Sequence, residues 1–169
     1  MLTVKQNPTK AEALYIAKNL RQQEVNEIES FNASPVRDVL TGVKGSKLVF
    51  CVYNGEEPIA LVGLCEYPYE EDAGLVWLMT TEAVKNNSIA FVHIIRDLIE
   101  THGSMYSKLI SFVDLKATTH QKFNNIAGFT LTDEIMTCQK TGMQFLVFEL
   151  ITTKGLEALY YSAPKEHVQ

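Results

Sequence analysis

Residues 111–129 read SFVDLKATTHQKFNNIAGF, and this stretch decides the fold. Its start closes an apolar, β-branched run, Leu109–Val113, which is typical of a strand. Thr118 and Gln121 then have the spacing of a capping box, in which each side chain accepts a hydrogen bond from the backbone N–H of the other residue. Gly128 stands where a helix would stop, because glycine adopts the left-handed cap with least steric cost. The pattern predicts a strand followed by one short helix with an abrupt end.

This short helix predicts how the chain crosses the sheet. Phe123 and Ile126 are its larger apolar residues and are expected to face inward. Two more strands are expected after it, near Thr130–Ile135 and Phe145–Ile151, joined by a turn that contains Gly142. The helix should therefore cover one face of a sheet and return the chain for a last hairpin.

The N-terminal region predicts two helices. The sequence TKAE at residues 9–12 fits a capping box, and apolar residues recur at helical spacing after it, so one helix is expected over residues 10–29. The SP pair at residues 34–35 is a preferred helix start. The second helix is expected to end at Gly42 or Gly45.

The central region predicts a sheet that is covered on both faces. The segment KLVFCVY is followed by an Asn-Gly pair, the strongest short hairpin signal, and PIALVGLCEY returns as the partner strand. A third strand is expected at Leu75–Thr80, and a long helix should begin at Asn87 or Ser88. Because the three strands are almost continuously apolar, helices are expected on both sides of the sheet.

Composition and charge exclude several classes of protein. A chain of 169 residues with 46% hydrophobic and 21% charged content is typical of one globular domain. The net charge of −5 does not provide the basic face that nucleic-acid binding requires. No apolar run approaches the ~18 residues of a membrane-spanning helix, and the N-terminus lacks the pattern of a secretory signal. We therefore expect no nucleic-acid partner, no membrane span and a protein of the cytoplasm, or one packaged from it.

The cysteines and histidines predict no metal site. Cys51, Cys65 and Cys138 form no CxxC pair, and buried, reduced thiols are expected. His93 and His102 lack the spacing of zinc ligands.

The expected order of elements is helix, helix, three antiparallel strands, helix, strand, helix, strand, strand. Together with residues 111–129, this order resembles the GNAT acyltransferase superfamily, whose last conserved block typically reads V-x-x-x-N-x-x-A-x-x-x-Y-x-x-x-G-F. Val113 and the pair Gly128-Phe129 fit the two ends of that block. The resemblance implies a single GNAT-like α/β domain with a central, mostly antiparallel mixed sheet and helices on both faces.

The chain is more closely similar to a phage branch of this fold, whose members are described as acetyltransferases or as internal virion protein A. The shared features are the Leu20-Arg21 pair, hairpin and strand segments like NGEEPIALVG and GLVWLMTTEAV, and Val113-Asp114 followed by an x-x-H helix start, here Thr118-Thr119-His120. The resemblance covers residues 10–150 and places the domain within residues 1–152. Residues 153–169 are then a C-terminal extension.

In an active GNAT enzyme, the resemblance implies that the fourth strand pairs with the pantetheine of acetyl-CoA and that a glycine-rich loop receives its pyrophosphate. The residues in these places, which would bind the cofactor if coenzyme A binds at all, are Leu78, Met79, Thr80, Lys85, Asn87 and Ser88. The loop TTEAVKNNS contains no glycine, and Glu82 adds a negative charge where two phosphates would lie. Ordinary acetyl-CoA chemistry is therefore not expected.

Candidate catalytic residues are few. Asn124 occupies the place of the family tyrosine that often protonates the leaving thiolate, and an amide cannot act as a general acid. Glu66, at a strand end, is a candidate base for an amine substrate, and a solvated loop is the alternative. His120, at a helix start, is a second candidate, and a capping or packing role is the alternative.

Two functions of different class follow. The first is a phage virion-associated or assembly protein that keeps the fold but has lost acetyl-CoA chemistry, located in the virion or in the host cytoplasm during assembly. Its expected partners are other virion proteins or further copies of itself. The second is an acetyl-CoA-dependent N-acyltransferase with an atypical cofactor loop. Residues 153–169 carry an apolar stripe, including Leu156, Leu159 and Tyr160, at the spacing of an interaction helix.

Overall fold

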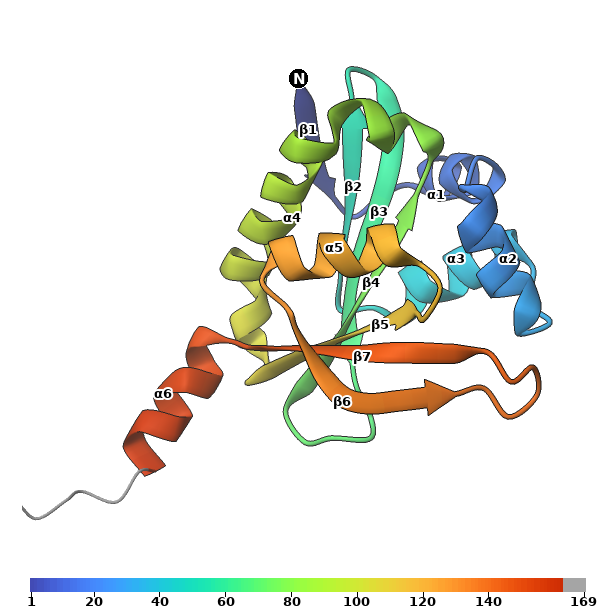
Figure 1. Ribbon diagram of the computed structural model, residues 1–169. Helices are drawn as coiled ribbons and strands as arrows, with labels where there is room; N and C mark the ends of the chain where they lie inside the picture. Colours follow the sequence, from blue (N-terminus) through green and yellow to red (C-terminus); the bar gives the residue numbers. More distant parts are fainter. Residues whose placement is uncertain (163–169) are drawn as a thin grey trace, which may run out of the picture.

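A computed structural model describes residues 1–162 of the chain. One seven-stranded sheet forms its centre, in the order β1-β2-β3-β4-β5-β7-β6 (Figure 1). Only β4 and β5 are parallel, so the expected mixed, mostly antiparallel sheet is confirmed. The strands are β1 Leu2–Gln6, β2 Leu48–Asn54, β3 Glu57–Glu66, β4 Ala73–Thr80, β5 Lys108–Asp114, β6 Thr130–Thr137 and β7 Gln144–Ile151.

Helices cover both faces of the sheet, as expected (Figure 1). On one face, α4 and α5 bury the larger apolar core, which includes Phe91, Leu109 and Phe148. On the other face, α1 and α3 bury a second core around Val39 and Leu61. The helices are α1 Lys10–Lys18, α2 Gln22–Ser30, α3 Pro35–Gly45, α4 Ser88–His102, α5 Thr118–Ala127 and α6 Thr153–Ser162, with short 3-10 helices η1 Glu82–Asn87 and η2 Gly103–Met105.

The prediction of a single helix over residues 10–29 is wrong. The Thr9–Glu12 capping box is present, but the helix ends at Lys18 and a separate helix, α2, begins at Gln22. The break occurs because Leu20 forms an isolated antiparallel bridge with Thr81, and the backbone N–H of Arg21 donates to the carbonyl of Thr80. A tertiary contact with β4 therefore interrupts a pattern that is locally helical.

Most other expected elements are confirmed, with small shifts of boundary. Helix α3 begins after Ser34, whose side chain accepts from the N–H of Arg37, and it ends at Gly45 rather than Gly42. The Asn-Gly pair lies at the β2–β3 hairpin. Helix α4 starts at Ser88, but Asn87 makes no side-chain cap, because η1 runs directly into the helix.

Helix α5 confirms the glycine stop and corrects the start. Gly128 has the left-handed backbone expected of it, with φ +103°, and the N–H of Phe129 donates back to the carbonyl of Asn124. The predicted capping box is absent: Ala117 is the cap residue, and Gln121 donates to the carbonyl of Leu115 instead. The buried face of α5 differs from the predicted one, since Asn124 and Ala127 are buried whereas Ile126 is exposed.

Strand β1 lies outside the sequence-based order, and α6 is a helix within the expected C-terminal extension. Strand β1 pairs with β2 at the edge of the sheet and was not predicted from the sequence. Helix α6 occupies residues 153–162, and the remainder of the expected extension, residues 163–169, lies outside the described residues. Within residues 1–162, no helix combines the length and hydropathy needed to cross a membrane.

Candidate functional site

A cleft of about 730 Å³ opens where β4 and β5 separate. The two strands pair only at Ala73–Leu75 and Lys108–Ile110, and beyond these residues β4 has no neighbouring strand on that side. Apolar side chains from both faces of the sheet line the cleft, among them Trp77, Leu78 and Phe91. The splayed strands thus create an apolar passage with polar groups at its ends, the usual character of a ligand site.

The connection between α1 and α2 occupies the free edge of β4. The carbonyl of Thr80 accepts from the backbone N–H of Arg21 at 3.1 Å. The backbone N–H of Thr80 donates to both carboxylate oxygens of Glu24 at 3.1 Å, and its hydroxyl donates to the same carboxylate at 2.7 Å. The last residue of β4 therefore has both of its main-chain groups paired with residues 21 and 24.

Glu24 is a buried carboxylate at the centre of this arrangement. Burial raises its pKa to about 7, although the hydrogen bonds from Thr80 and the nearby charge of Arg21 act in the opposite direction. Near neutral pH, the charged and the neutral form of Glu24 are therefore both populated. Strongly shifted groups in a cleft are typical of functional sites, and also occur in structural networks.

The end of the cleft between α2 and α3 is acidic. Glu27 lies one turn after Glu24, and burial raises its pKa to about 7, with the charge of Asp114 adding to the effect. Among the described residues, its buried oxygen Oε1 has no hydrogen-bond partner. Burial also raises the pKa of Asp38, which lines the same end. A cationic or amine group would be complementary to these carboxyl groups.

An aromatic pair stands beside the acidic end. The rings of Phe31, at the end of α2, and Phe145, at the start of β7, stack with their centroids 5.6 Å apart. Both line the cleft.

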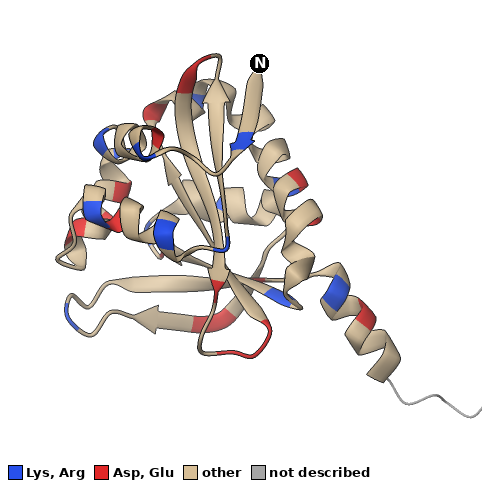
Figure 2. Ribbon diagram, turned by 180° about the vertical axis from the view of Figure 1, so that it is seen from behind, with Lys and Arg blue, Asp and Glu red and all other residues tan. Residues whose placement is uncertain are grey.

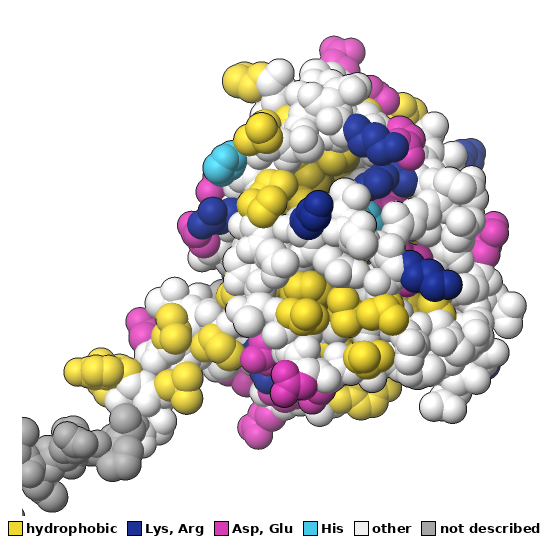
Figure 3. All heavy atoms as spheres, in the orientation of Figure 1, with side chains coloured by type: hydrophobic (Ala, Val, Ile, Leu, Met, Phe, Trp, Pro, Cys, Tyr) yellow, Lys and Arg dark blue, Asp and Glu magenta, His cyan; other side chains and the backbone are white. Residues whose placement is uncertain are grey.

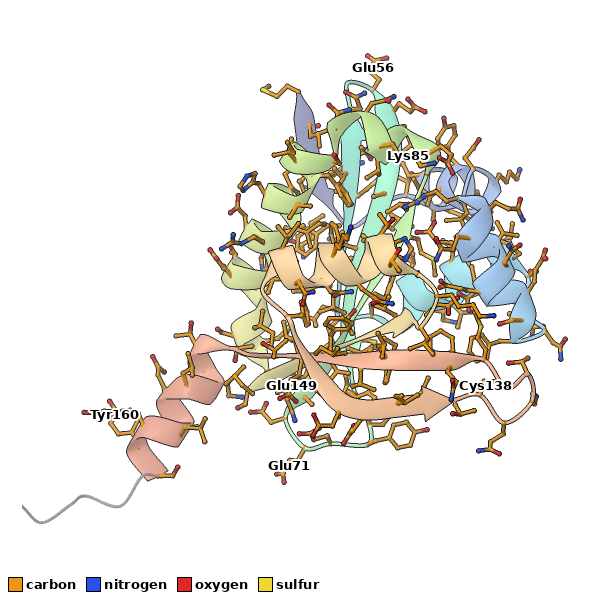
Figure 4. The ribbon with its side chains drawn as sticks, viewed as in Figure 1. Glu56, Glu71, Lys85, Cys138, Glu149 and Tyr160 are labelled. Atoms are coloured by element: carbon orange, nitrogen blue, oxygen red, sulfur yellow. The ribbon has the colours of Figure 1, made fainter. Side chains whose placement is uncertain are left out.

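Basic side chains lie in the same cleft, and Arg21 is close enough to Glu24 and Glu27 to lower the pKa of both. Nη1 of Arg21 lies 3.3 Å from Nε2 of His120, and Nε of Arg21 lies 3.9 Å from Oε1 of Glu82. Burial and the charge of Arg21 lower the pKa of His120, so its ring is neutral near pH 7. Lys85 forms an ion pair with Glu82, and Figure 4 shows Lys85 where β4 gives way to α4. Lys85 is thus paired with Glu82, whereas Arg21 contacts His120 and lies only within ion-pair distance of the same carboxylate.

The start of α4 differs from an open helix terminus. The 3-10 helix η1 precedes it without a break, and its i,i+3 bonds use backbone N–H groups there. Glu82 lies in the first turn of η1.

The structure brings most of the sequence-predicted site residues together and leaves two apart. Those that line the cleft are Leu78, Met79, Thr80, Lys85, Ser88, His120 and Asn124. Asn87 and Glu66 do not line it, and Glu66 lies at the end of β3. Asn124 is buried and donates from its amide to the carbonyl of His120 at 3.3 Å.

Sequence reasoning missed the acidic residues of the cleft. Glu24, Glu27 and the cap residue Phe31 share one face of α2, but the sequence pattern predicts this segment as part of a longer helix and assigns these residues no role. The only available signal was that carboxylates shared the i, i+3, i+4, i+7 face with Ile28. Across residues 1–162, no three His, Cys, Asp or Glu side chains gather into a group that could hold a metal ion.

No protein-family model and no curated protein matches this sequence. Solved structures do match over almost the whole chain. An aminoglycoside N(6′)-acetyltransferase from Legionella pneumophila superposes with a TM-score of 0.67 at 15% identity, covering 96% of each chain. A spermidine N-acetyltransferase chimera from Vibrio cholerae gives 0.66 at 14% identity, covering 92% of this chain and 98% of that one.

A protein described as a GNAT-family acetyltransferase from Desulfovibrio desulfuricans gives 0.61 at 12% identity, with 89% and 99% covered. The chain therefore has the fold of the GNAT acetyltransferases. Sequence identity this low establishes the fold and leaves activity to be argued from the site.

Proposed function

We propose that the protein is a bacteriophage virion-associated or assembly protein that retains the GNAT fold without ordinary acetyl-CoA chemistry. The observation that carries this proposal is the pairing of Glu24 and Arg21 with Thr80. The resemblance to active GNAT enzymes implies that the end of the fourth strand offers free main-chain groups to an extended cofactor. Here Arg21 and Glu24 satisfy those of Thr80. Displacing Glu24 would leave a buried carboxylate without partners, at a cost of about 1–3 kcal/mol or more.

The residues around the start of α4 do not fit a pyrophosphate. Anion sites at helix starts rely on free backbone N–H groups and an approach unobstructed by side chains. Residues 80–88 contain no glycine, η1 occupies this segment, and Glu82 places a carboxylate there. Lys85 and Arg21 are the nearby cations, and both face Glu82. Against this one carboxylate, the two cations leave a single surplus positive charge for the two phosphates.

The virion role is supported by the sequence resemblance to the phage branch and by the exposed apolar helix α6. Leu156, Leu159, Tyr160 and Tyr161 are all exposed on this helix. Tyrosines and aliphatic side chains of this kind commonly anchor protein interfaces. A protein that acts in assembly has a use for such a helix.

The test is a calorimetric titration of the full-length chain with acetyl-CoA. The expected dissociation constant is weaker than about 1 mM. Mass spectrometry of purified phage particles that encode the chain should also detect it. Micromolar binding of acetyl-CoA, or absence of the chain from both the particles and their assembly intermediates, would contradict the proposal.

One observation favours a second candidate, an N-acyltransferase that acts on an amine. Glu27 has a pKa raised to about 7 and an oxygen without a hydrogen-bond partner in the cleft, which suits a general base that takes a proton from an amine. Acetylation of an amine panel should then depend on Glu27. Glu27→Gln would lower kcat/KM about 100-fold, whereas Glu29→Gln, an exposed site on the same helix, would leave it unchanged.

A further inference from the structure

The direction of helix α6 is set by contacts at its first turn. The hydroxyl of Thr152 donates to the carbonyl of Tyr106 and accepts from the N–H of Gly155. Gly155 is buried against the backbone of Ser107, so closely that a Cβ would lie 2.1 Å from the Ser107 carbonyl oxygen. Lys154 pairs with Asp72 at 2.8 Å. These contacts aim α6 away from its own β6 and β7 (Figure 1).

Beyond its first turn, α6 presents an apolar stripe to solvent. The α6 stripe consists of Leu156, Leu159 and Tyr160, which share one face at i, i+3, i+4 and are 58%, 61% and 78% exposed. Figure 4 shows Tyr160 pointing away from the domain. A helix of ten residues is marginal in water, and most helical stability in proteins comes from packing an apolar face. The stripe therefore requires a surface to pack against.

A matching apolar surface lies on β6 and β7. Leu131 and Ile135 pair directly with Phe148 and Leu146, so they lie on the α5 face of the sheet. Leu131 is 48% and Ile135 is 53% exposed, because α5 does not extend over β6. With Leu146 they form the β6–β7 strip. Figure 3 shows hydrophobic side chains gathered between α5 and these strands, and also along α6.

The strip is suited to a helix rather than to another strand. The register of β6 shifts between Leu131 and Ile135, and this bulge carries Asp133 and Glu134 at the edge of the sheet (Figure 2). Bulges and charges at an edge strand prevent strand addition. The same carboxylates can accept hydrogen bonds from tyrosine hydroxyls, and Tyr160 and Tyr161 provide two.

We propose that the α6 stripe of one copy of the chain packs on the β6–β7 strip of a second copy. The arriving helix continues the layer that α4 and α5 form and covers the part of the sheet that α5 leaves bare. One chain carries both halves of the contact, and a mutual exchange of α6 helices about a two-fold axis closes into a dimer. The exposed residues of α6 also support the proposed function, but the dimer does not require a virion role.

The first test measures mass in solution by sedimentation equilibrium. The wild-type chain is expected to have twice the mass of one chain at micromolar concentration. Leu156→Asp with Leu159→Asp, and separately Leu131→Asp with Ile135→Asp, are each expected to give monomers. All four residues are about half exposed or more, so both variants should keep the wild-type circular dichroism spectrum. A monomeric wild type, or a strip variant that remains dimeric, would overturn the proposal.

The second test identifies the partner surface. An unlabelled chain that carries a photo-crosslinking residue in place of Leu159 is mixed with isotope-labelled wild-type chain. A crosslink that joins unlabelled α6 to a labelled peptide must then have formed between two copies. Crosslinks to residues 130–137 are expected. The photo-crosslinking residue placed instead at Tyr69, an exposed site on the β3–β4 loop, should give no crosslink to residues 130–137. Crosslinks from position 159 to α6 itself would show helix–helix pairing instead and would refute the exchange.

Discussion

The carboxylate of Glu24 accepts hydrogen bonds from the backbone N–H of Thr80 at 3.1 Å and from its hydroxyl at 2.7 Å, although 56 residues separate the two in sequence. This pairing ties α2 to the end of β4 at the point where β4 loses its neighbouring strand. The adjacent bridge between Leu20 and Thr81 breaks the chain between α1 and α2, and burial of the carboxylate, against the effect of these hydrogen bonds, raises the pKa of Glu24. The Glu24–Thr80 contact thus belongs both to the fold and to the cleft.

The first prediction concerns the pH dependence of stability. Burial raises the pKa of Glu24 from 4.5 to about 7 on folding. Between these values the folded state holds a proton that the unfolded state has released, so the Glu24 contribution to stability decreases as pH rises. Glu24→Gln cannot lose a proton. The free energy of unfolding of the variant, relative to wild type, should therefore rise by about 3 kcal/mol between pH 4 and pH 8.

Urea denaturation at a series of pH values measures this difference. Glu29→Gln, an exposed site on α2, is the matched control for a change of net charge. His120 acts in the opposite direction, because its lowered pKa makes stability rise with pH, but it is common to both chains and cancels in the difference. A relative stability that is constant with pH would show that Glu24 is not held as described.

Local sequence signals were sufficient for most of the fold. The Asn-Gly hairpin, the apolar strands β2 to β4 and Gly128 each specify structure through neighbours in sequence, which is why their placement is confirmed. The break at Leu20 depends on a bridge to Thr81, a partner that periodicity does not reveal. The same limitation explains why a helix was expected to continue there.

The candidate site was predictable only in part. Residues on β4 and at the start of α4 were located by the family resemblance, since they occupy fixed places along the chain. Glu24 and Glu27 were not located, because a glutamate on a polar-looking helix is normally solvated. Their burial arises from packing over the splay between β4 and β5, which is a property of the tertiary structure.

A second prediction concerns Gly63, which lies directly opposite Trp77 on the neighbouring strand. A Cβ at Gly63 would lie 1.9 Å from the indole ring, whose N–H donates to the hydroxyl of Ser46 at 2.8 Å. Gly63→Ala should therefore destabilise the protein by about 2 kcal/mol through overpacking. Gly45→Ala, where a Cβ would meet nothing, is the control. Since Trp77 is the only tryptophan, its fluorescence should shift in the first variant and stay constant in the second.

A third prediction concerns the stop of α5. Gly128 has φ +103°, where a residue with a Cβ is strained. Gly128→Ala should lower the free energy of unfolding by about 1 kcal/mol or more, measured by chemical denaturation. A neutral result would mean that the chain can leave α5 by another route.

The last prediction concerns the anchor of α6. Because a Cβ at Gly155 would lie 2.1 Å from the carbonyl oxygen of Ser107, Gly155→Ala must displace the first turn of the helix. Gly155 is the only buried residue of α6 within the described chain, so the domain itself should stay folded, with a loss of stability of about 1 kcal/mol or less. The backbone N–H groups of α6 should lose protection in hydrogen exchange, and the dimer should weaken at least tenfold because the helix no longer points at the second copy. Glu157→Ala, on the same helix and exposed, should change neither quantity. If Gly155→Ala dimerises as the wild type does, then the anchoring contacts do not direct α6, and its docking must depend on the stripe alone.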